Sequence, residues 1–210
     1  PGRVGRVWRG RKTETVAAHR PCAPAHKFLH SIFYHKGFFN MGLLKTIQTG
    51  RRPRPPRIMI YGTPGIGKST TAAGTPGAAF LSTEDGLSEI DCHQFPLATS
   101  LSEVLDILQS LSMEPHDYQT LVIDTLDWLE AIIHKTVSKE HGDVPIEKID
   151  GGYGHGYAYV NKKWSDILDA LTYLRNERNM MVILLAHAKI ERFEDPEEAA
   201  YDRYSPSLHK

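Results

Sequence analysis

The chain has 210 residues, of which 40% are hydrophobic and 24% are charged, with only two cysteines. This composition is typical of one globular domain with an appended segment, and two cysteines exclude a disulfide framework. The longest apolar run, Met180 to Ala186, is far shorter than the roughly 20 residues that a membrane-spanning helix needs. Without an apolar signal core, the expected location is the reducing cytoplasm, with no membrane partner.

The formal net charge of zero hides a strong asymmetry along the chain. Residues 1–56 carry 12 basic and 1 acidic side chains, whereas residues 57–210 carry 13 basic and 24 acidic ones, so their net charges are +11 and −11. Such a break is expected between a basic, disordered tail and an acidic folded body. Because no methionine precedes Met41, we expect residues 1–40 to be non-native. The alternative is a native basic arm that contacts phosphates.

The tail also contains four residues that zinc sites use, at compact spacing. Zinc frameworks normally show a second close ligand pair separated by a folded turn, which this segment lacks. We therefore interpret the group as accidental; its members are Cys22, His26, His30 and His35.

From Arg57 onward, short apolar runs alternate with segments of helical periodicity. The apolar runs predict strands at 58–61, 78–82, 121–124 and 181–186, the last ending at His187. Helices are predicted from Gly67 to before Gly74, after a capping box of Ser100 and Glu103, and around 128–137 and 160–174. This alternation predicts an α/β fold of three layers, with a mostly parallel central sheet covered on both faces.

Residues 62–69 satisfy the pattern G-x-x-x-x-G-K-[ST] of a phosphate-binding P loop, between a predicted strand and a helix start. Glycines let the backbone amides turn inward around a phosphate, and the helix N-terminus adds partial positive charge. Lys68 is predicted to reach the β and γ phosphates, Ser69 to ligate Mg²⁺, and Thr70 to contact the α phosphate. The predicted nucleotide-binding residues are Gly62, Thr63, Pro64, Gly65, Ile66, Gly67, Lys68, Ser69 and Thr70. The alternative is a plain glycine-rich turn.

Two further strand ends supply candidate catalytic groups. Asp124 ends an apolar strand, so we expect it to hold Mg²⁺ through water rather than to cap the next helix, a role that suits Asp127 better. The expected general base is Glu84, which follows the second strand, with Asp85 as second choice and a solvated acidic turn as the alternative. His187 is predicted to sense the γ phosphate by hydrogen bonding; the alternative is a structural histidine.

These residues in this order resemble the RecA-like P-loop ATPases, in particular phage-encoded ATP-binding proteins associated with single-strand annealing and recombination. The resemblance covers about residues 57–210 and rests on 60–69, 80–86, 121–127, 152–157, 184–189 and 204–210. It implies that Glu84 is the catalytic base and that His187, where RecA proteins have glutamine, couples nucleotide to DNA. It also implies a homo-oligomer, in which Arg203 or Lys210 completes a neighbouring site. RecA-like cores continue with further strands, so we expect a C-terminal truncation.

The same resemblance places two DNA-facing loops at about 141–157 and 190–209. The first loop offers Tyr153, His155 and Tyr157 for stacking on unpaired bases, and an ordinary flexible loop is the alternative. Lys162 and Lys163 follow it and could serve phosphates, although charges on an exposed helix are usually just solvated.

The function that these observations favour is a Mg²⁺-dependent ATPase that acts on single-stranded DNA in phage recombination or replication, within the host cytoplasm. An annealing or single-strand-binding protein is the expected partner. One alternative is a nucleotide-gated binding module that does not hydrolyse ATP. The other is a small nucleotide kinase, which the lack of arginine between Arg57 and Arg175 disfavours. We prefer ATP to GTP because no guanine signature Asn-Lys-x-Asp is present.

Overall fold

The computed structural model describes residues 47, 49–194 and 199–209. Most of the basic tail lies outside this part of the chain, including the group interpreted as accidental, which is Cys22, His26, His30 and His35. The strands are β1 (Arg57–Gly62), β2 (Ala78–Ser82), β3 (His93–Gln94), β4 (Thr120–Asp124), β5 (Met181–Phe193) and β6 (Tyr201–Pro206). The helices are α2 (Lys68–Ala73), α3 (Leu101–Met113), α4 (Leu126–Glu140) and α5 (His155–Glu177), with a short 3₁₀ segment η2 (Ile146–Gly151).

The strands form a sheet in the order β1-β5-β4-β2-β3, in which every neighbouring pair is parallel. The register places Gly62 of β1 beside His187 of β5, and Ser82 of β2 beside Asp124 of β4. Because all these strands run in one direction, the polar residues that end them meet at one edge of the sheet. We call this the carboxyl edge and define it as Gly62–Thr70, Ser82–Glu84, Asp124–Asp127 and His187.

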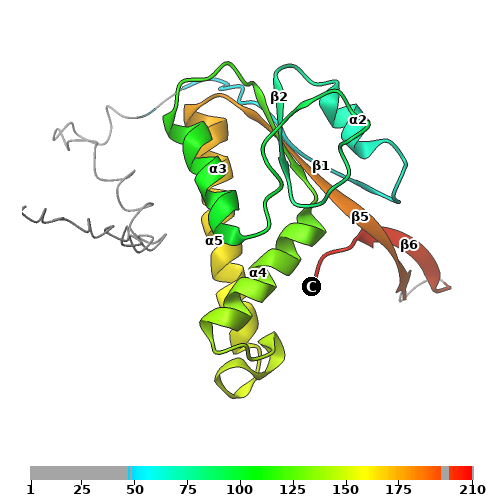
Figure 1. The fold of residues 1–210 in the computed structure, drawn as a ribbon. Helices are drawn as coiled ribbons and strands as arrows, with labels where there is room; N and C mark the ends of the chain where they lie inside the picture. The colour runs from blue at the N-terminus through cyan, green and yellow to red at the C-terminus, as the bar shows by residue number, and fades with distance from the viewer. Residues whose placement is uncertain (1–46, 48, 195–198, 210) are drawn as a thin grey trace, which may run out of the picture. The chain divides into compact units, whose positions relative to one another are not determined.

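Helices cover the two faces of the sheet unequally, as Figure 1 shows: α3, α4 and α5 lie on one side and α2 on the other. The larger apolar core joins these three helices to the sheet through residues such as Ile133, Ile167 and Leu121. A smaller core packs Ala72 of α2 against Phe80 and Ile183. The predicted α/β fold with a mostly parallel, doubly covered sheet is confirmed.

Local signals in the sequence set where the helices begin. The Ser100 hydroxyl accepts a hydrogen bond from the Glu103 N–H, and the Glu103 carboxylate accepts one from the Ser100 N–H, so the predicted capping box is present at the start of α3. In α5, Gly156 packs so closely on η2 that an added Cβ would collide with the Ile146 carbonyl. Among the described residues, no helix is both long and apolar enough to span a membrane.

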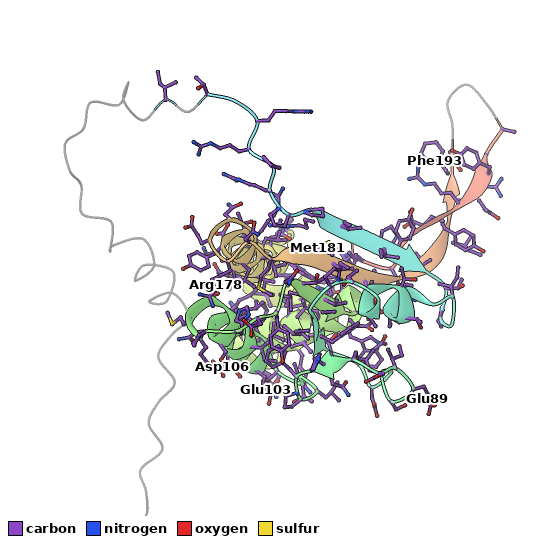
Figure 2. The ribbon with its side chains drawn as sticks, turned by 90° about the horizontal axis from the view of Figure 1, so that it is seen from above. Glu89, Glu103, Asp106, Arg178, Met181 and Phe193 are labelled. Atoms are coloured by element: carbon purple, nitrogen blue, oxygen red, sulfur yellow. The ribbon has the colours of Figure 1, made fainter. Side chains whose placement is uncertain are left out.

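Strand β5 differs from the prediction that it ends at His187. It continues for six residues to Phe193 and pairs antiparallel with β6, Ala188 lying opposite Pro206 and Phe193 opposite Tyr201. The reason is that this extension mixes polar and apolar residues instead of forming an apolar run, so its sequence lacks the signal of a buried strand, and it pairs with β6 instead. Figure 2 shows the resulting hairpin projecting beyond the sheet, with Phe193 near its tip.

Candidate active site

The P loop connects β1 to α2 at the carboxyl edge. Gly65 and Gly67 have φ angles of +77° and +92°, a left-handed conformation that side chains with a Cβ disfavour, and Gly67 is the N-cap of α2. These two turns bring the backbone around so that α2 begins at Lys68, as predicted. Backbone N–H groups at such a turn and at a helix N-terminus form a concave site for an anion.

Lys68 is held within this loop rather than extended into solvent. Its side chain is buried, and its Nζ donates hydrogen bonds of 3.2 Å each to the carbonyls of Gly62 and Thr63. A buried ammonium so close to the glycine turns provides the positive charge that a phosphate chain needs. By contrast, Ile66 of the same loop is largely exposed, and Thr70 lies at the exposed surface of the first turn of α2.

Ser69 and Asp124 meet across the carboxyl edge, as expected for two ligands of one cation. The Ser69 hydroxyl donates a 2.6 Å hydrogen bond to Oδ2 of Asp124. The other carboxylate oxygen, Oδ1, is buried and has no hydrogen-bond partner, and burial raises the pKa of Asp124. An unpaired buried carboxylate oxygen beside a hydroxyl fits a hard cation such as Mg²⁺, which prefers oxygen ligands.

Hydrogen bonds between two threonines fix Glu84 relative to Asp124. Thr83 directly precedes Glu84, and Thr125 directly follows Asp124. The Thr83 hydroxyl donates to the Thr125 carbonyl (2.7 Å) and accepts from the Thr125 N–H (3.0 Å), while the Thr83 N–H donates to the Asp124 carbonyl (2.8 Å). Both threonines are buried. Sequence reasoning missed this clamp, whose two threonines lie 42 positions apart in the chain.

The Glu84 carboxyl group faces His187 from across the sheet. The distance between its Oε1 and His187 Nε2 is 3.8 Å. Burial raises the pKa of Glu84, and the positive charge that His187 carries when it is protonated opposes that shift only in part. A carboxyl group whose pKa lies above its ordinary value takes up a proton more readily, as a general base requires.

Asp127 is not the helix cap that the sequence suggested. The N-cap of α4 is Thr125, which makes no side-chain capping bond, and Asp127 lies in the first turn. Its carboxylate instead accepts two hydrogen bonds from His187, one from the backbone N–H (3.0 Å) and one from ring Nδ1 (2.8 Å). Burial would raise the pKa of Asp127, but these hydrogen bonds outweigh it and hold the pKa below its usual range. The sequence gives no sign of this pair, which joins residues 60 positions apart.

The first predicted DNA-facing segment, 141–157, is more ordered than a mobile loop. It contains η2, and α5 already begins at His155. The Tyr157 ring stacks on His209 with centroids 4.4 Å apart, and its hydroxyl donates to Glu147. Tyr153 remains almost fully exposed, at 99%, and His155 is exposed as well. The reason is that Gly151, Gly152 and Gly154 build tight turns at positive φ rather than a flexible linker.

The second predicted segment, 190–209, is the β5–β6 hairpin followed by a short C-terminal stretch. Ile190 lies opposite Tyr204 and both are exposed, whereas Arg203 lies over the Phe193 ring, 4.2 Å from its centroid. Arg203 is thus described by the structure, whereas Lys210 lies outside the described residues. Lys162 and Lys163 pair with carboxylates at 3.3 Å and 2.7 Å; their partners are Asp166 and Glu140.

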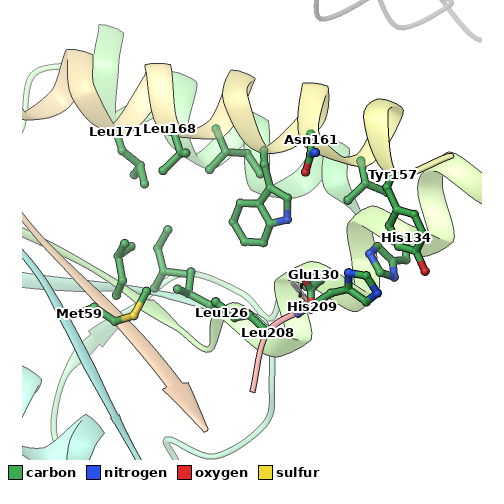
Figure 3. A pocket seen from close by; sticks show the side chains of 15 residues that line it. Met59, Leu126, Glu130, His134, Tyr157, Asn161, Leu168, Leu171, Leu208 and His209 are labelled. Atoms are coloured by element: carbon green, nitrogen blue, oxygen red, sulfur yellow. Dashed lines mark hydrogen bonds between the residues drawn. The ribbon is translucent and has the colours of Figure 1, made fainter. Parts of the chain in front are cut away.

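A second concave region lies between the sheet, at β1 and β5, and the helices α4 and α5. It is a groove of about 300 Å³ that shares no residue with the P loop. Figure 3 shows apolar side chains such as Met59 and Leu171 at one end and Glu130, His134 and His209 at the other. No phosphate-binding turn and no unpaired carboxylate lines it, so its chemistry differs from that of the carboxyl edge.

A family model described as an AAA domain matches residues 54–210. The chain belongs to this AAA domain family. As an AAA domain, it is a nucleotide-binding protein of the ATPase class, and the matched residues contain every group of the carboxyl edge. A search among curated proteins found no match.

Proposed function

We propose that this AAA domain is a Mg²⁺-dependent ATPase of the RecA type that acts on single-stranded DNA in phage recombination or replication. The observation that carries the proposal is the grouping of the P loop, Asp124 and Glu84 at one edge of the sheet, with a buried carboxylate oxygen of Asp124 left without a partner. That grouping matches the three tasks of ATP hydrolysis: holding the phosphates, holding the cation and accepting a proton.

The residues present fit both groups that the reaction needs. The P-loop amides and Lys68 would hold the phosphates of ATP, and Ser69 and Asp124 would hold Mg²⁺. The cation would supply neutralisation of the charge on the phosphates. The rest of the work belongs to side chains that are already fixed by their neighbours, such as Lys68 through the loop carbonyls.

Glu84 performs the proton transfer in this proposal. A water oxygen forms a bond to the γ phosphorus while one water proton passes to the Glu84 carboxylate. The bond between the γ phosphorus and the β,γ-bridging oxygen breaks, and its electron pair stays with ADP. The products are ADP and inorganic phosphate, and the proton on Glu84 then returns to solvent.

The β5–β6 hairpin supports single-stranded DNA as the partner. It exposes Tyr201 and Tyr204, with Arg192 and Arg203 on the same two strands, and aromatic and arginine side chains together suit stacking on unpaired bases. The acidic residues Glu191 and Asp202 on the same strands limit its net positive charge. We accordingly expect moderate, salt-sensitive affinity, with a homo-oligomer and an annealing or single-strand-binding protein adding contacts.

The test is phosphate release from MgATP, with and without single-stranded DNA, alongside direct titration of nucleotide binding. We expect Glu84→Gln to lower the rate of release by about 10²- to 10⁴-fold while MgATP still binds. Lys68→Ala is expected to weaken MgATP binding by about 10- to 100-fold, the value of charged hydrogen bonds of about 1.5–3 kcal/mol.

Asp106→Asn is the matched control, because it removes an exposed acid on α3 away from the carboxyl edge. It should behave as the unaltered chain does. Release that Glu84→Gln leaves unchanged would move the base elsewhere. Tight MgATP binding with no release would favour the nucleotide-gated module, and release that single-stranded DNA does not accelerate would reject DNA as the partner.

A further inference from the structure

The contact between Asp127 and His187 uses the whole carboxylate of Asp127. One oxygen accepts the backbone N–H of His187 and the other accepts ring Nδ1, at 3.0 and 2.8 Å. Both side chains are mostly shielded, with 18% and 22% of their surfaces exposed. Because the backbone and the ring are gripped together, the imidazole has little freedom to turn.

This grip also determines what each ring nitrogen can do. An ionised carboxylate only accepts hydrogen bonds, so the hydrogen of a neutral imidazole must lie on Nδ1. Nε2 then carries a lone pair and is an acceptor. It faces Oε1 of Glu84 at 3.8 Å, which is too long for a direct hydrogen bond. The two atoms are therefore neighbouring acceptors on one side of the P loop.

We propose that Asp127 is a positioning residue that keeps His187 Nε2 an acceptor, so that His187 and Glu84 hold the attacking water by its two hydrogens. This inference rests on the proposed ATPase function. Two acceptors on one water direct its oxygen lone pair away from both, toward the phosphate. One water proton moves to Glu84 as the bond to phosphorus forms, and the other stays in its hydrogen bond to Nε2. This role differs from the γ-phosphate sensor that the sequence suggested for His187, since a sensor must donate.

Asp127→Asn tests the idea with almost no change of shape. The amide oxygen still accepts the His187 N–H, but the amide NH₂ now donates to Nδ1 and forces the ring hydrogen onto Nε2. We expect kcat to fall by about 10- to 100-fold, as for lost partners that orient a working histidine, while the Kd for MgATP changes less than about twofold. Glu130→Gln is the matched control: it neutralises an acid one turn further along α4 that accepts the His209 N–H rather than a hydrogen bond from His187.

Two further measurements separate positioning from a merely structural role. In a His187→Ala background, Asp127→Asn should lower kcat no further, because its effect passes through the ring. Nitrogen-15 histidine NMR of the nucleotide-free protein at pH 8, where a free imidazole is neutral, should show His187 protonated at Nδ1, and at Nε2 in Asp127→Asn.

The outcomes distinguish the two proposals. If the unaltered protein shows no turnover, the ATPase proposal fails, and the NMR spectra still decide whether Asp127 sets the tautomer. If the unaltered protein does turn over, three results would overturn the inference. The first is a ring hydrogen on Nε2 of His187 in the unaltered protein, and the second is a kcat of Asp127→Asn within twofold of the unaltered protein's kcat. The third is that Asp127→Asn lowers kcat by the same factor in the His187→Ala background as it does alone.

Discussion

The carboxyl edge and the α3–α5 face of the sheet bury opposite kinds of side chain. Of the seven polar or charged residues buried in the described part of the chain, five lie at the carboxyl edge: Lys68, Ser82, Thr83, Asp124 and Thr125. The α3–α5 face buries almost only aliphatic side chains. Burying a polar group destabilises the fold unless the group finds a hydrogen-bond partner, whereas burying an aliphatic side chain stabilises the fold. The helical face thus stabilises the edge at which the chemistry is concentrated.

The groove beneath α4 and α5 and the carboxyl edge also differ in the chemical groups that line them. The groove beneath α4 and α5 is a large hollow, yet it has neither a P loop nor an unpaired carboxylate. The carboxyl edge has both, arranged by the ends of β1, β2 and β4 and by His187 in the middle of β5. The apolar groove and the convergent chemical groups therefore lie at different places in this molecule.

The largest effect on stability is expected from truncating a buried side chain in the core beneath the α3–α5 face. Ile133 of α4 is fully buried, so Ile133→Ala should lower the free energy of unfolding by about 2–5 kcal/mol. The Kd for MgATP, measured at low temperature where the variant stays folded, should be unchanged. Trp128→Ala on the same helix, where the ring is 51% exposed, is the control and should cost far less. Equal losses of stability in both variants, or weaker MgATP binding in Ile133→Ala, would break the comparison.

An intermediate effect is expected at the start of α3. Ser100→Ala removes the hydroxyl that accepts the Glu103 N–H and should lower the free energy of unfolding by about 1 kcal/mol. Urea unfolding with unchanged m value would report it, and ATP hydrolysis should not change. Replacement by Asp, which also caps helices, should restore stability. A Ser100→Asp variant as unstable as Ser100→Ala would show that the capping bond contributes nothing.

The smallest effect has the opposite sign and comes from the carboxyl edge. Because the folded-state pKa of Glu84 is raised, the folded protein loses stability as pH rises through the unfolded and then the folded pKa. Glu84→Gln cannot ionise, so without nucleotide or Mg²⁺ it should be slightly more stable than the unaltered chain at pH 7.5. The advantage should vanish at low pH, where the carboxyl group is protonated in both states.

Asp127→Asn is the matched control for this prediction because its sign is reversed. The folded-state pKa of Asp127 is lowered, so its carboxylate stabilises the fold above the unfolded pKa and loses that contribution as pH falls. The variant should therefore be less stable than the unaltered chain at pH 7.5. Urea unfolding at both pH values checks the pair, and a Glu84→Gln variant that is less stable than the unaltered chain at pH 7.5 would contradict the raised folded-state pKa of Glu84.

Local patterns made the P loop, the ends of β2 and β4 and the capping box predictable, but not the end of β5. Each depends on spacings of a few residues, as from Gly62 to Ser69 or from Ser100 to Glu103. The contacts that were missed join distant positions through hydrogen bonds that no spacing encodes. Thr83 meets Thr125, and Asp127 meets His187, only because β2, β4 and β5 lie side by side. The roles of these site residues remain predictions that the experiments above address.

Strand β5 gives the site a long reach. His187 lies at its middle, so the residue held by Asp127 and the half-buried Phe193 near the hairpin tip are parts of a single extended segment. At about 3.3 Å per residue, the tip lies roughly 20 Å along the strand from the imidazole. Any tilt of this paired ribbon about His187 would therefore displace Phe193 much farther than the residues beside the imidazole.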